Sequence, residues 1–242
     1  MFEEIDKKKQ ELDQKRPLPV HTLRSIREHL IVNWTYHSNA IEGNTLTLSE
    51  TKVALEGITI GGKTIKEHLE VINHKEAILY VEDIVRRQEP LSEWQIKSIH
   101  RLILKSIDDE HAGAYRNENV IISGATHIPS DFVQVKALME ELIQHYDLHW
   151  QTNVHALERA SLLHIEFVKI HSFIDGNGRT ARLLLNFELM KNGYPPIVIE
   201  KEDRAEYYRA LDLAHTTGDH SQFIGLVTRT LNRTFDLYLR LI

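Results

Sequence analysis

A twelve-residue segment gathers most of the side chains in this sequence that could act together in chemistry. The run His171-Ser-Phe-Ile-Asp175-Gly-Asn177-Gly-Arg179-Thr-Ala-Arg182 combines a titratable base, a carboxylate, an amide, two glycines and two arginines. A base, a hard oxygen ligand and forked cations are the groups that act on a phosphate ester with its metal ion. The segment therefore predicts a site for a phosphorylated substrate.

The glycines and arginines predict how an anion would be held. Gly176 and Gly178 tolerate positive φ and let bare backbone N–H groups approach a ligand. A helix that begins near Arg179 would add the positive end of its dipole. Arg179 and Arg182 would oppose that dipole unless an anion compensates them. Because guanidinium groups bind phosphate oxygens in a forked geometry, both arginines are expected to bind phosphate.

Two further side chains of the segment have separate expected roles. Asp175 is a poor phosphate ligand alone, but a carboxylate can share Mg²⁺ with substrate phosphates. His171 lies just before the turn, where it could act as a general base near neutral pH. The alternative is an ordinary turn with a capping histidine, which has no need of the other groups.

The segment resembles the signature of the Fic domain, His-Pro-Phe-x-(Asp/Glu)-Gly-Asn-Gly-Arg-x-x-Arg. It matches at every position except Ser172, where most members have proline, and this departure puts the rigidity of the loop in question. Proteins with this signature are all-helical nucleotide-transferring enzymes that move AMP from ATP onto a protein hydroxyl, with Mg²⁺. The resemblance implies that His171 deprotonates the target hydroxyl and that Asp175 holds the metal.

The resemblance also implies the nucleotide contacts. Asn177, with the backbone of Gly176 and Gly178, would orient the α-phosphate, and Arg179 and Arg182 would hold the distal phosphates. The phosphate cradle does not by itself identify the base. Transfer of another nucleotide or of a phosphoryl group is therefore an alternative, as is a non-catalytic module that binds a nucleotide or a partner.

A second motif lies far upstream of the first. Ser38-Asn-Ala-Ile-Glu42-Gly43-Asn44 resembles the inhibitory segment of Fic proteins. Apolar residues at helical spacing predict one helix from about residue 20, and Gly43 is a natural terminator for it. An acid at the C-terminal end of a helix is electrostatically unfavourable, so Glu42 requires a cation.

The resemblance implies that this cation is Arg182. The pair formed with Glu42 would then occupy the space that the γ-phosphate of the nucleotide needs. In some Fic proteins a glutamate at this place also supports the removal of AMP, which makes a second reaction an expectation here. A surface glutamate beside a glycine cap is the alternative interpretation.

Weaker signals surround these two motifs. Short apolar runs around a glycine-containing turn predict a small hairpin, and the resemblance makes it a flap that holds the target by strand-like pairing. The residues expected to line this flap are Val120, Ile121, Ile122, Thr126 and His127. Tyr207 and Tyr208 are expected to cover the adenine by stacking, with core packing as the alternative. His215 stands where many relatives have asparagine.

Composition narrows the classes of function. The 242 residues are 42% hydrophobic and 26% charged, which is typical of a globular protein. A net charge of −6 predicts no general attraction to nucleic acid or to anionic membranes. The absence of cysteine, of a ~20-residue apolar run and of a signal peptide favours a cytoplasmic protein. The expected partners are ATP and a protein hydroxyl, and a homodimer is left open.

The elements that must position these residues are helices. Helical patterns cover about 1–16, 20–43, 50–56 with Ser49 as cap, 65–88, a segment opened by a capping box from Ser92 to Gln95, a segment from Pro129, and the C-terminal residues from about 222. The sequence thus predicts an all-α, Fic-type helical bundle with a small β-hairpin flap. Residues 1–19 are interpreted as an N-terminal helical extension, and 20–242 as the Fic domain that includes the inhibitory helix.

Overall fold

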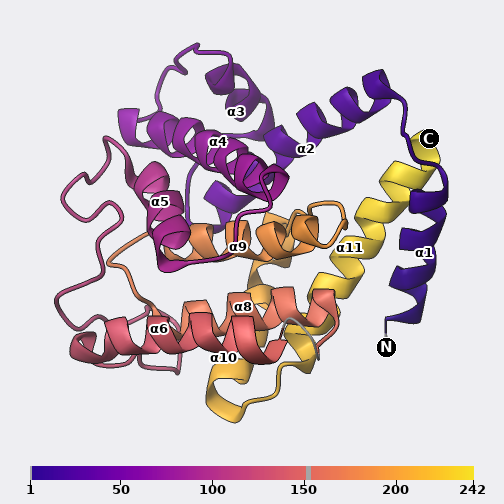
Figure 1. Ribbon diagram of the computed structural model, residues 1–242. Coiled ribbons are helices and arrows are strands. Elements are labelled where there is room, and N and C mark those ends of the chain that lie inside the picture. The colour runs from indigo at the N-terminus through magenta and orange to yellow at the C-terminus, as the bar shows by residue number, and fades with distance from the viewer. Residues whose placement is uncertain (1, 151–153) are drawn as a thin grey trace.

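The computed structural model describes residues 2–150 and 154–242, and these residues form helices and loops without a strand (Figure 1). In chain order the helices are α1 (Glu3–Gln14), α2 (Val20–Ile41), α3 (Leu48–Leu55), α4 (Ile65–Arg86), α5 (Glu93–Leu104), η1 (Phe132–Gln134), α6 (Val135–His145), η2 (Tyr146–Trp150), α8 (Ala156–Ile170), α9 (Asn177–Lys191), η3 (Lys201–Asp203), α10 (Arg204–Thr217) and α11 (Ser221–Leu241). The all-α prediction is confirmed. Within the described ranges, no helix has both the length and the apolarity that crossing a bilayer requires.

Helix α9 is the centre of the bundle, because it contacts α8, α4, α5 and α2 (Figure 1). Its apolar residues face in all directions, as expected of a buried helix. Leu184 and Phe187 belong to a core cluster shared with α4, α5 and α6. Leu185 and Leu189 belong to a second cluster shared with α10 and α11. One helix therefore joins both hydrophobic cores, and the chemistry-bearing loop lies directly before it.

Helix starts differ in detail from the prediction. The cap of α3 is Thr47 and not Ser49, because the Thr47 side chain accepts from the Glu50 N–H while the Glu50 carboxylate accepts from the Thr47 N–H. At α5 the predicted capping box is absent. The Ser92 hydroxyl donates to the Gln95 side-chain oxygen and makes no bond to the backbone. The polar side chains there satisfy each other, so the backbone N–H groups of the first turn are left without this cap.

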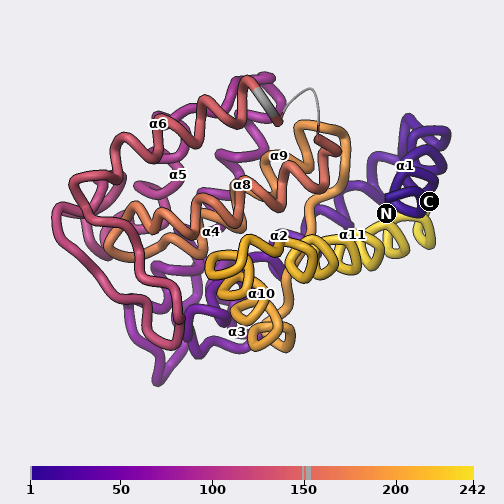
Figure 2. Tube along the Cα trace, turned by 90° about the horizontal axis from the view of Figure 1, so that it is seen from below, coloured from indigo at the N-terminus to yellow at the C-terminus, as the bar shows by residue number. Residues whose placement is uncertain are grey.

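Helix α1 packs along α11, and Figure 2 shows the two side by side at one end of the molecule. Ile5 and Leu12 lie on the inner face of α1, are fully buried, and join the second cluster together with Phe235 of α11. Polar residues of α1 add contacts, since Lys8 donates to Asp236 of α11 at 2.6 Å and Asp6 accepts from the Tyr194 hydroxyl at 3.2 Å. The segment interpreted as an extension thus packs against the bundle through an apolar stripe.

The hairpin prediction is wrong, because residues 105–131 form a loop without strand pairing. A turn is present, with the Ala125 N–H donating to the Ile122 carbonyl at 3.2 Å. The N–H groups of Thr126 and His127 instead donate to one carboxylate oxygen of Asp212 on α10, at 2.7 and 3.1 Å. Since α10 takes these two donors, they cannot form a ladder with the opposite arm.

Candidate active site

The loop between α8 and α9 has two backbone positions in the left-handed region. His171 ends α8 at φ 51°, and Gly176 precedes α9 at φ 78°. The buried side chain of Asn177 closes the loop, because its amide donates to the Phe173 carbonyl at 2.8 Å and accepts from the Phe173 N–H at 3.0 Å. The resemblance assigns the side-chain amide of Asn177 to the α-phosphate, but in this structure the amide closes the loop.

The two glycines of the loop serve different purposes. Gly176 has positive φ, as the sequence predicts, whereas Gly178 lies inside α9. A Cβ on Gly178 would lie 2.3 Å from the Glu42 carboxylate oxygen Oε1. Gly178 is thus needed for a close approach between α2 and α9 and not for its backbone angle, which corrects the prediction for this residue.

Arg182 is buried and bonded to the end of α2. One nitrogen, Nη2, donates to Glu42 Oε1 at 2.7 Å and to the Ser38 carbonyl at 2.8 Å. Nε donates to the Ser38 hydroxyl at 3.0 Å. Glu42 is the C-cap of α2, and Gly43 follows at φ 99°. The structure therefore brings together the two sequence motifs, as expected from the resemblance.

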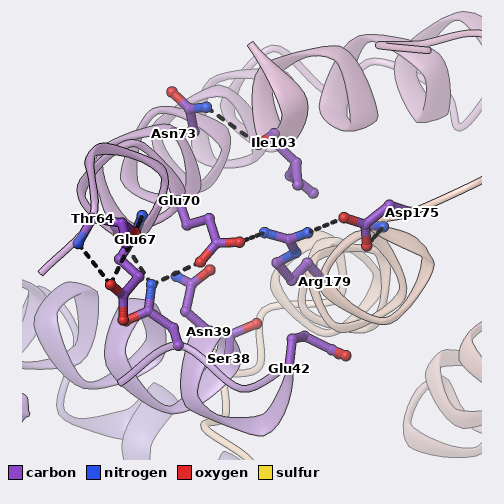
Figure 3. Close-up of polar contacts among 12 residues, drawn as sticks. Ser38, Asn39, Glu42, Thr64, Glu67, Glu70, Asn73, Ile103, Asp175 and Arg179 are labelled. Carbon is purple, nitrogen blue, oxygen red and sulfur yellow. Dashed lines mark hydrogen bonds and ion pairs between the residues drawn. The ribbon is translucent and has the colours of Figure 1, made fainter. Parts of the chain in front are cut away.

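Arg179 is also buried, but it pairs with different acids. Figure 3 shows its guanidinium between Glu70 of α4, at 3.4 Å, and Asp175, at 3.3 Å. Nε and Nη1 have no hydrogen-bond partner among the described residues. Carboxylates thus compensate the two arginines, in the place of the anion that the sequence predicts. Glu70 was not predicted, because nothing in the pattern of α4 distinguishes it from a surface acid.

His171 is held neutral at pH 7. Burial is the main cause, and the nearby Arg116 guanidinium adds to it, so that the pKa of His171 falls to about 4 although the Glu42 and Asp175 carboxylates oppose the shift. A neutral imidazole can accept a proton, which a general base requires. The low pKa reduces its strength as a base but keeps it available at every pH near neutrality.

Asp175 meets the requirements of a Mg²⁺ ligand. Burial works against ionisation, but Arg179 and the Gly176 N–H outweigh it and hold the pKa of Asp175 below its usual value. Its side chain is 52% exposed, so an oxygen can reach an ion. The described residues contain no group of three or more His, Asp or Glu side chains that could hold a metal. Mg²⁺ would therefore be bound by Asp175 together with phosphate oxygens and water.

The two tyrosines of α10 occupy different environments. Tyr207 is buried in the second core cluster, where its hydroxyl contacts Arg182 Nη1 at 3.3 Å and His164 Nε2 at 3.0 Å. Tyr207 therefore packs in the core, which was the alternative to stacking on adenine, because no face of its ring is open to a base. Tyr208 is partly exposed, and its hydroxyl lies 3.5 Å from Glu42 Oε2. Tyr208 remains a predicted adenine contact.

The predicted flap residues lie along one loop beside α10. Thr126 and His127 are its fixed end, and the His127 ring also contacts the Lys169 carbonyl at 3.0 Å. Ile121 is 85% exposed and Ile128 is exposed as well, whereas Val120 and Ile122 are partly buried. The loop thus presents apolar side chains to solvent close to the end of α8.

A buried histidine that the sequence did not reveal supports the loop. His100 of α5 stacks on Phe173 with ring centroids 3.6 Å apart. Its Nδ1 accepts from the Gly113 N–H at 2.9 Å, so its Nε2 carries the proton and donates to the Asp175 carbonyl at 2.8 Å. His100 is one of the apolar-face positions of α5, where a histidine is not distinguishable from a core residue by sequence.

The fold and the loop together define a helical protein in which a glycine-containing loop, with one histidine and one aspartate, leads into a buried central helix that carries two arginines. The sequence pattern of the Fic/DOC family matches residues 90–189. Among solved structures, Fic-1 (residues 134–508) from C. elegans superimposes with a TM-score of 0.89 at 31% identity, over 98% of this chain and 70% of that one. A Fic domain-containing signalling protein from Bacteroides thetaiotaomicron has a TM-score of 0.90 at 30% identity, over 98% of this chain and 96% of its own. The chain belongs to the Fic/DOC family.

Curated relatives show the same likeness. Protein adenylyltransferase Fic from Drosophila melanogaster is 35% identical over 218 residues, which is 90% of this chain and 44% of that protein. Its counterpart from Drosophila grimshawi is 35% identical over 235 residues, with 94% and 48% covered. The chain thus spans about half of the length of these relatives.

Buried histidines predict a loss of stability in mild acid. Burial lowers the pKa of His100 to about 4 and the pKa values of His74 and His164 well below the ordinary value. Between pH 6.5 and 4 the unfolded chain binds more protons than the folded one, so stability falls as pH falls through this window. His100 alone would contribute on the order of 3 kcal/mol. Denaturant unfolding at pH 7.5, 6 and 5 measures this change.

Two variants test whether His100 contributes to this loss of stability in acid. His100→Gln should unfold at a lower denaturant concentration at pH 7.5 but lose less stability between pH 7.5 and 5 than the wild type. The exposed His21→Gln serves as control and should follow the wild type at each pH. A wild-type stability that stays constant from pH 7.5 to 5 would contradict the prediction.

Proposed function

We propose that the protein is an autoinhibited protein adenylyltransferase, which transfers AMP from ATP to a Ser, Thr or Tyr hydroxyl of a target protein. The observation that carries the proposal is the pairing of Arg182 with Glu42 beside a neutral His171 and the Asp175 carboxylate. The names of the curated relatives support the activity.

In the proposed transfer, the neutral His171 ring accepts the proton of the target hydroxyl. The hydroxyl oxygen forms a bond to the α-phosphorus, and the bond from that phosphorus to the bridging oxygen of pyrophosphate breaks. The N-terminus of α9 stabilises the negative charge of the phosphate oxygens. Mg²⁺ bound at Asp175 would supply charge neutralisation to the phosphates.

Autoinhibition is supported by the space that Glu42 occupies. Its carboxylate lies 2.7 Å from Arg182 and fills the position beside Gly178, where even a Cβ would lie 2.3 Å away. A phosphate that binds Arg182 must therefore displace Glu42. Both groups are negatively charged, so they also repel each other at short distance. The inhibitory helix thus competes with the distal phosphate for one cation.

The proposed partners are ATP and a protein that carries a hydroxyl side chain. The net charge of −6 offers no general attraction to nucleic acid or to an anionic membrane. We place the protein in the cytoplasm, which agrees with the absence of cysteine from its sequence. A homodimer is compatible with this activity and is not required by it.

Glu42→Gly should raise AMP transfer, because it frees Arg182 for the γ-phosphate. A hydrogen bond between charged groups contributes about 1.5–3 kcal/mol, so an increase of about 10- to 100-fold is expected. The measurement is self-labelling of the purified protein with ATP labelled in the α-phosphate. Glu56→Gly is a matched control, since Glu56 is the C-cap of α3 and is followed by Gly57 at φ 87°, as Gly43 follows Glu42.

This control should label at the wild-type rate. Arg182→Ala should be inactive alone and in the Glu42→Gly background, because the same guanidinium binds the inhibitory Glu42 carboxylate and the phosphate of the substrate. Equal rates for wild type and Glu42→Gly at saturating ATP would show that Glu42 does not inhibit.

His171→Ala and Asp175→Ala should fail in different ways. Without the base, the Glu42→Gly protein should lose about 10²–10⁴-fold in labelling rate while ATP binding is retained. Without the carboxylate, the response to Mg²⁺ should be lost together with activity. Calorimetric titration with ATP, with and without Mg²⁺, distinguishes the loss of the base from the loss of the metal ligand. Labelling by UTP or GTP in preference to ATP would favour the alternative of another nucleotide.

A second reaction, removal of AMP, is favoured by the surroundings of Glu42. The carboxylate is partly exposed, its Oε2 lies beside the Tyr208 hydroxyl, and Gly43 has open space around it. We propose that this carboxylate can also accept a proton from a water whose oxygen forms a bond to the phosphorus of the attached AMP. The bond from that phosphorus to the target oxygen breaks, the released oxygen takes up a proton to become the hydroxyl again, and AMP leaves. Self-labelled Glu42→Gly protein should then lose its label to added wild type with Mg²⁺, but not to added Glu42→Gly or His171→Ala. Label that persists with wild type would restrict Glu42 to inhibition.

A further inference from the structure

Arg116 is a buried arginine that lies behind the active-site loop. It belongs to the loop between α5 and η1 and is 3% exposed. Its side-chain Nε donates to the His171 carbonyl at 2.8 Å, and its backbone N–H donates to the Ser172 carbonyl at 3.0 Å. Two consecutive peptide groups of the loop, including that of the proposed base, are therefore bonded to one residue.

The other nitrogens of Arg116 reach both ends of the predicted target-docking segment. Nη1 donates to the Glu118 carbonyl at 2.9 Å, and Nη2 donates to the Ser130 carbonyl. These carbonyls flank residues 119–129, which contain the predicted flap. Nη1 also donates to the side-chain oxygen of Asn119 at 3.4 Å. Among the described residues, the guanidinium bonds to amide oxygens and to no carboxylate. Its planar fork thus joins three backbone segments that are distant in sequence.

Asn177 closes the later part of the loop, but at the junction of His171 and Ser172 the side chains of the loop add little restraint. His171 has φ 51°, a region that costs a non-glycine residue free energy and persists where the surroundings fix it. Ser172 stands where the signature that the segment resembles has proline, and its buried hydroxyl has no hydrogen-bond partner among the described residues. The contacts from Arg116 to the carbonyls on both sides of this junction supply the restraint.

We propose that Arg116 is a positioning residue that fixes the backbone of His171 and couples it to the two ends of the target-docking segment. This inference rests on the proposed function, since it assigns a role within the same transfer reaction. Movement of the docking segment at Glu118 or Ser130 is transmitted through the guanidinium to the His171 carbonyl. A misplacement of a catalytic group by about 1 Å can reduce a rate by about 10²-fold, which sets the scale of the effect.

The charge of Arg116 has a second consequence for the base. It lowers the pKa of His171, after burial, while Glu42 and Asp175 raise it. Removal of the guanidinium by Arg116→Gln should therefore move the acidic limb of the rate profile to higher pH. A side chain that merely filled space would leave that limb in place.

The test compares Arg116→Gln and Arg116→Lys in the Glu42→Gly background, with self-labelling by ATP as the readout. The maximal rate should fall about 10- to 100-fold for Gln, and less for Lys, while the ATP concentration at half-maximal rate stays within about twofold. Arg159→Gln is the matched control. Arg159 is a buried arginine in the first turn of α8, at the opposite end from His171, and bonds to Glu188 and to the backbone carbonyls of Trp150 and Val154. It should lose stability but retain the rate of the folded protein.

Hydrogen exchange tests the coupling independently of activity. Arg116→Gln should speed amide exchange in residues 117–131 and in 171–173 together, whereas Arg159→Gln should change neither segment. Faster exchange in one segment alone, or an unchanged labelling rate in folded Arg116→Gln, would overturn the inference. If Glu42→Gly itself transfers no AMP, the proposed function fails, and the exchange experiment still decides whether Arg116 couples the two segments.

Discussion

The central constraint on this structure is the need to neutralise two guanidinium groups that the fold buries at the start of α9. A charge removed from water without compensation costs several kcal/mol. Arg116 is compensated by backbone carbonyls, whereas the two arginines of α9 are compensated by carboxylates. Glu42 at the end of α2 meets Arg182, and Glu70 of α4 meets Arg179 together with Asp175. The placement of α2 and α4 against α9 follows from the same contacts that satisfy these charges. Carboxylates of the protein itself in this way compensate both buried arginines.

Much of the candidate active site could be predicted from the sequence, because its parts are either close together in the chain or chemically distinctive. The loop from His171 to Arg182 is short, and its residue types could be interpreted without knowledge of distant neighbours. The pairing of Glu42 with Arg182 could be predicted because an acid at the C-terminal end of a helix needs a cation, and because the resemblance to Fic proteins indicated which cation it would be. The all-α fold followed from helical periodicity, although the cap of α3 was displaced from Ser49 to Thr47.

What the sequence could not reveal depends on tertiary contacts. The flap was predicted as a hairpin because local propensity could not show that Asp212 takes the N–H groups of Thr126 and His127. Tyr207 resembles a stacking residue in sequence, yet it packs beneath Arg182. His100 and Arg116 act through backbone atoms, and no spacing rule marks a side chain that bonds to a distant carbonyl.

The close fit between Glu42 and Gly178 determines how strongly dissolved salt affects the inhibitory ion pair of Glu42 and Arg182. Mobile ions screen exposed charges over about 8 Å at physiological ionic strength, but they screen buried pairs much less. Arg182 is 3% exposed, and one oxygen of the partly exposed Glu42 carboxylate lies against the bare backbone of Gly178. Salt therefore weakens the Glu42–Arg182 pair less than it would weaken an ion pair on the surface. The pair responds more strongly to a group that can enter the site and bind the guanidinium directly.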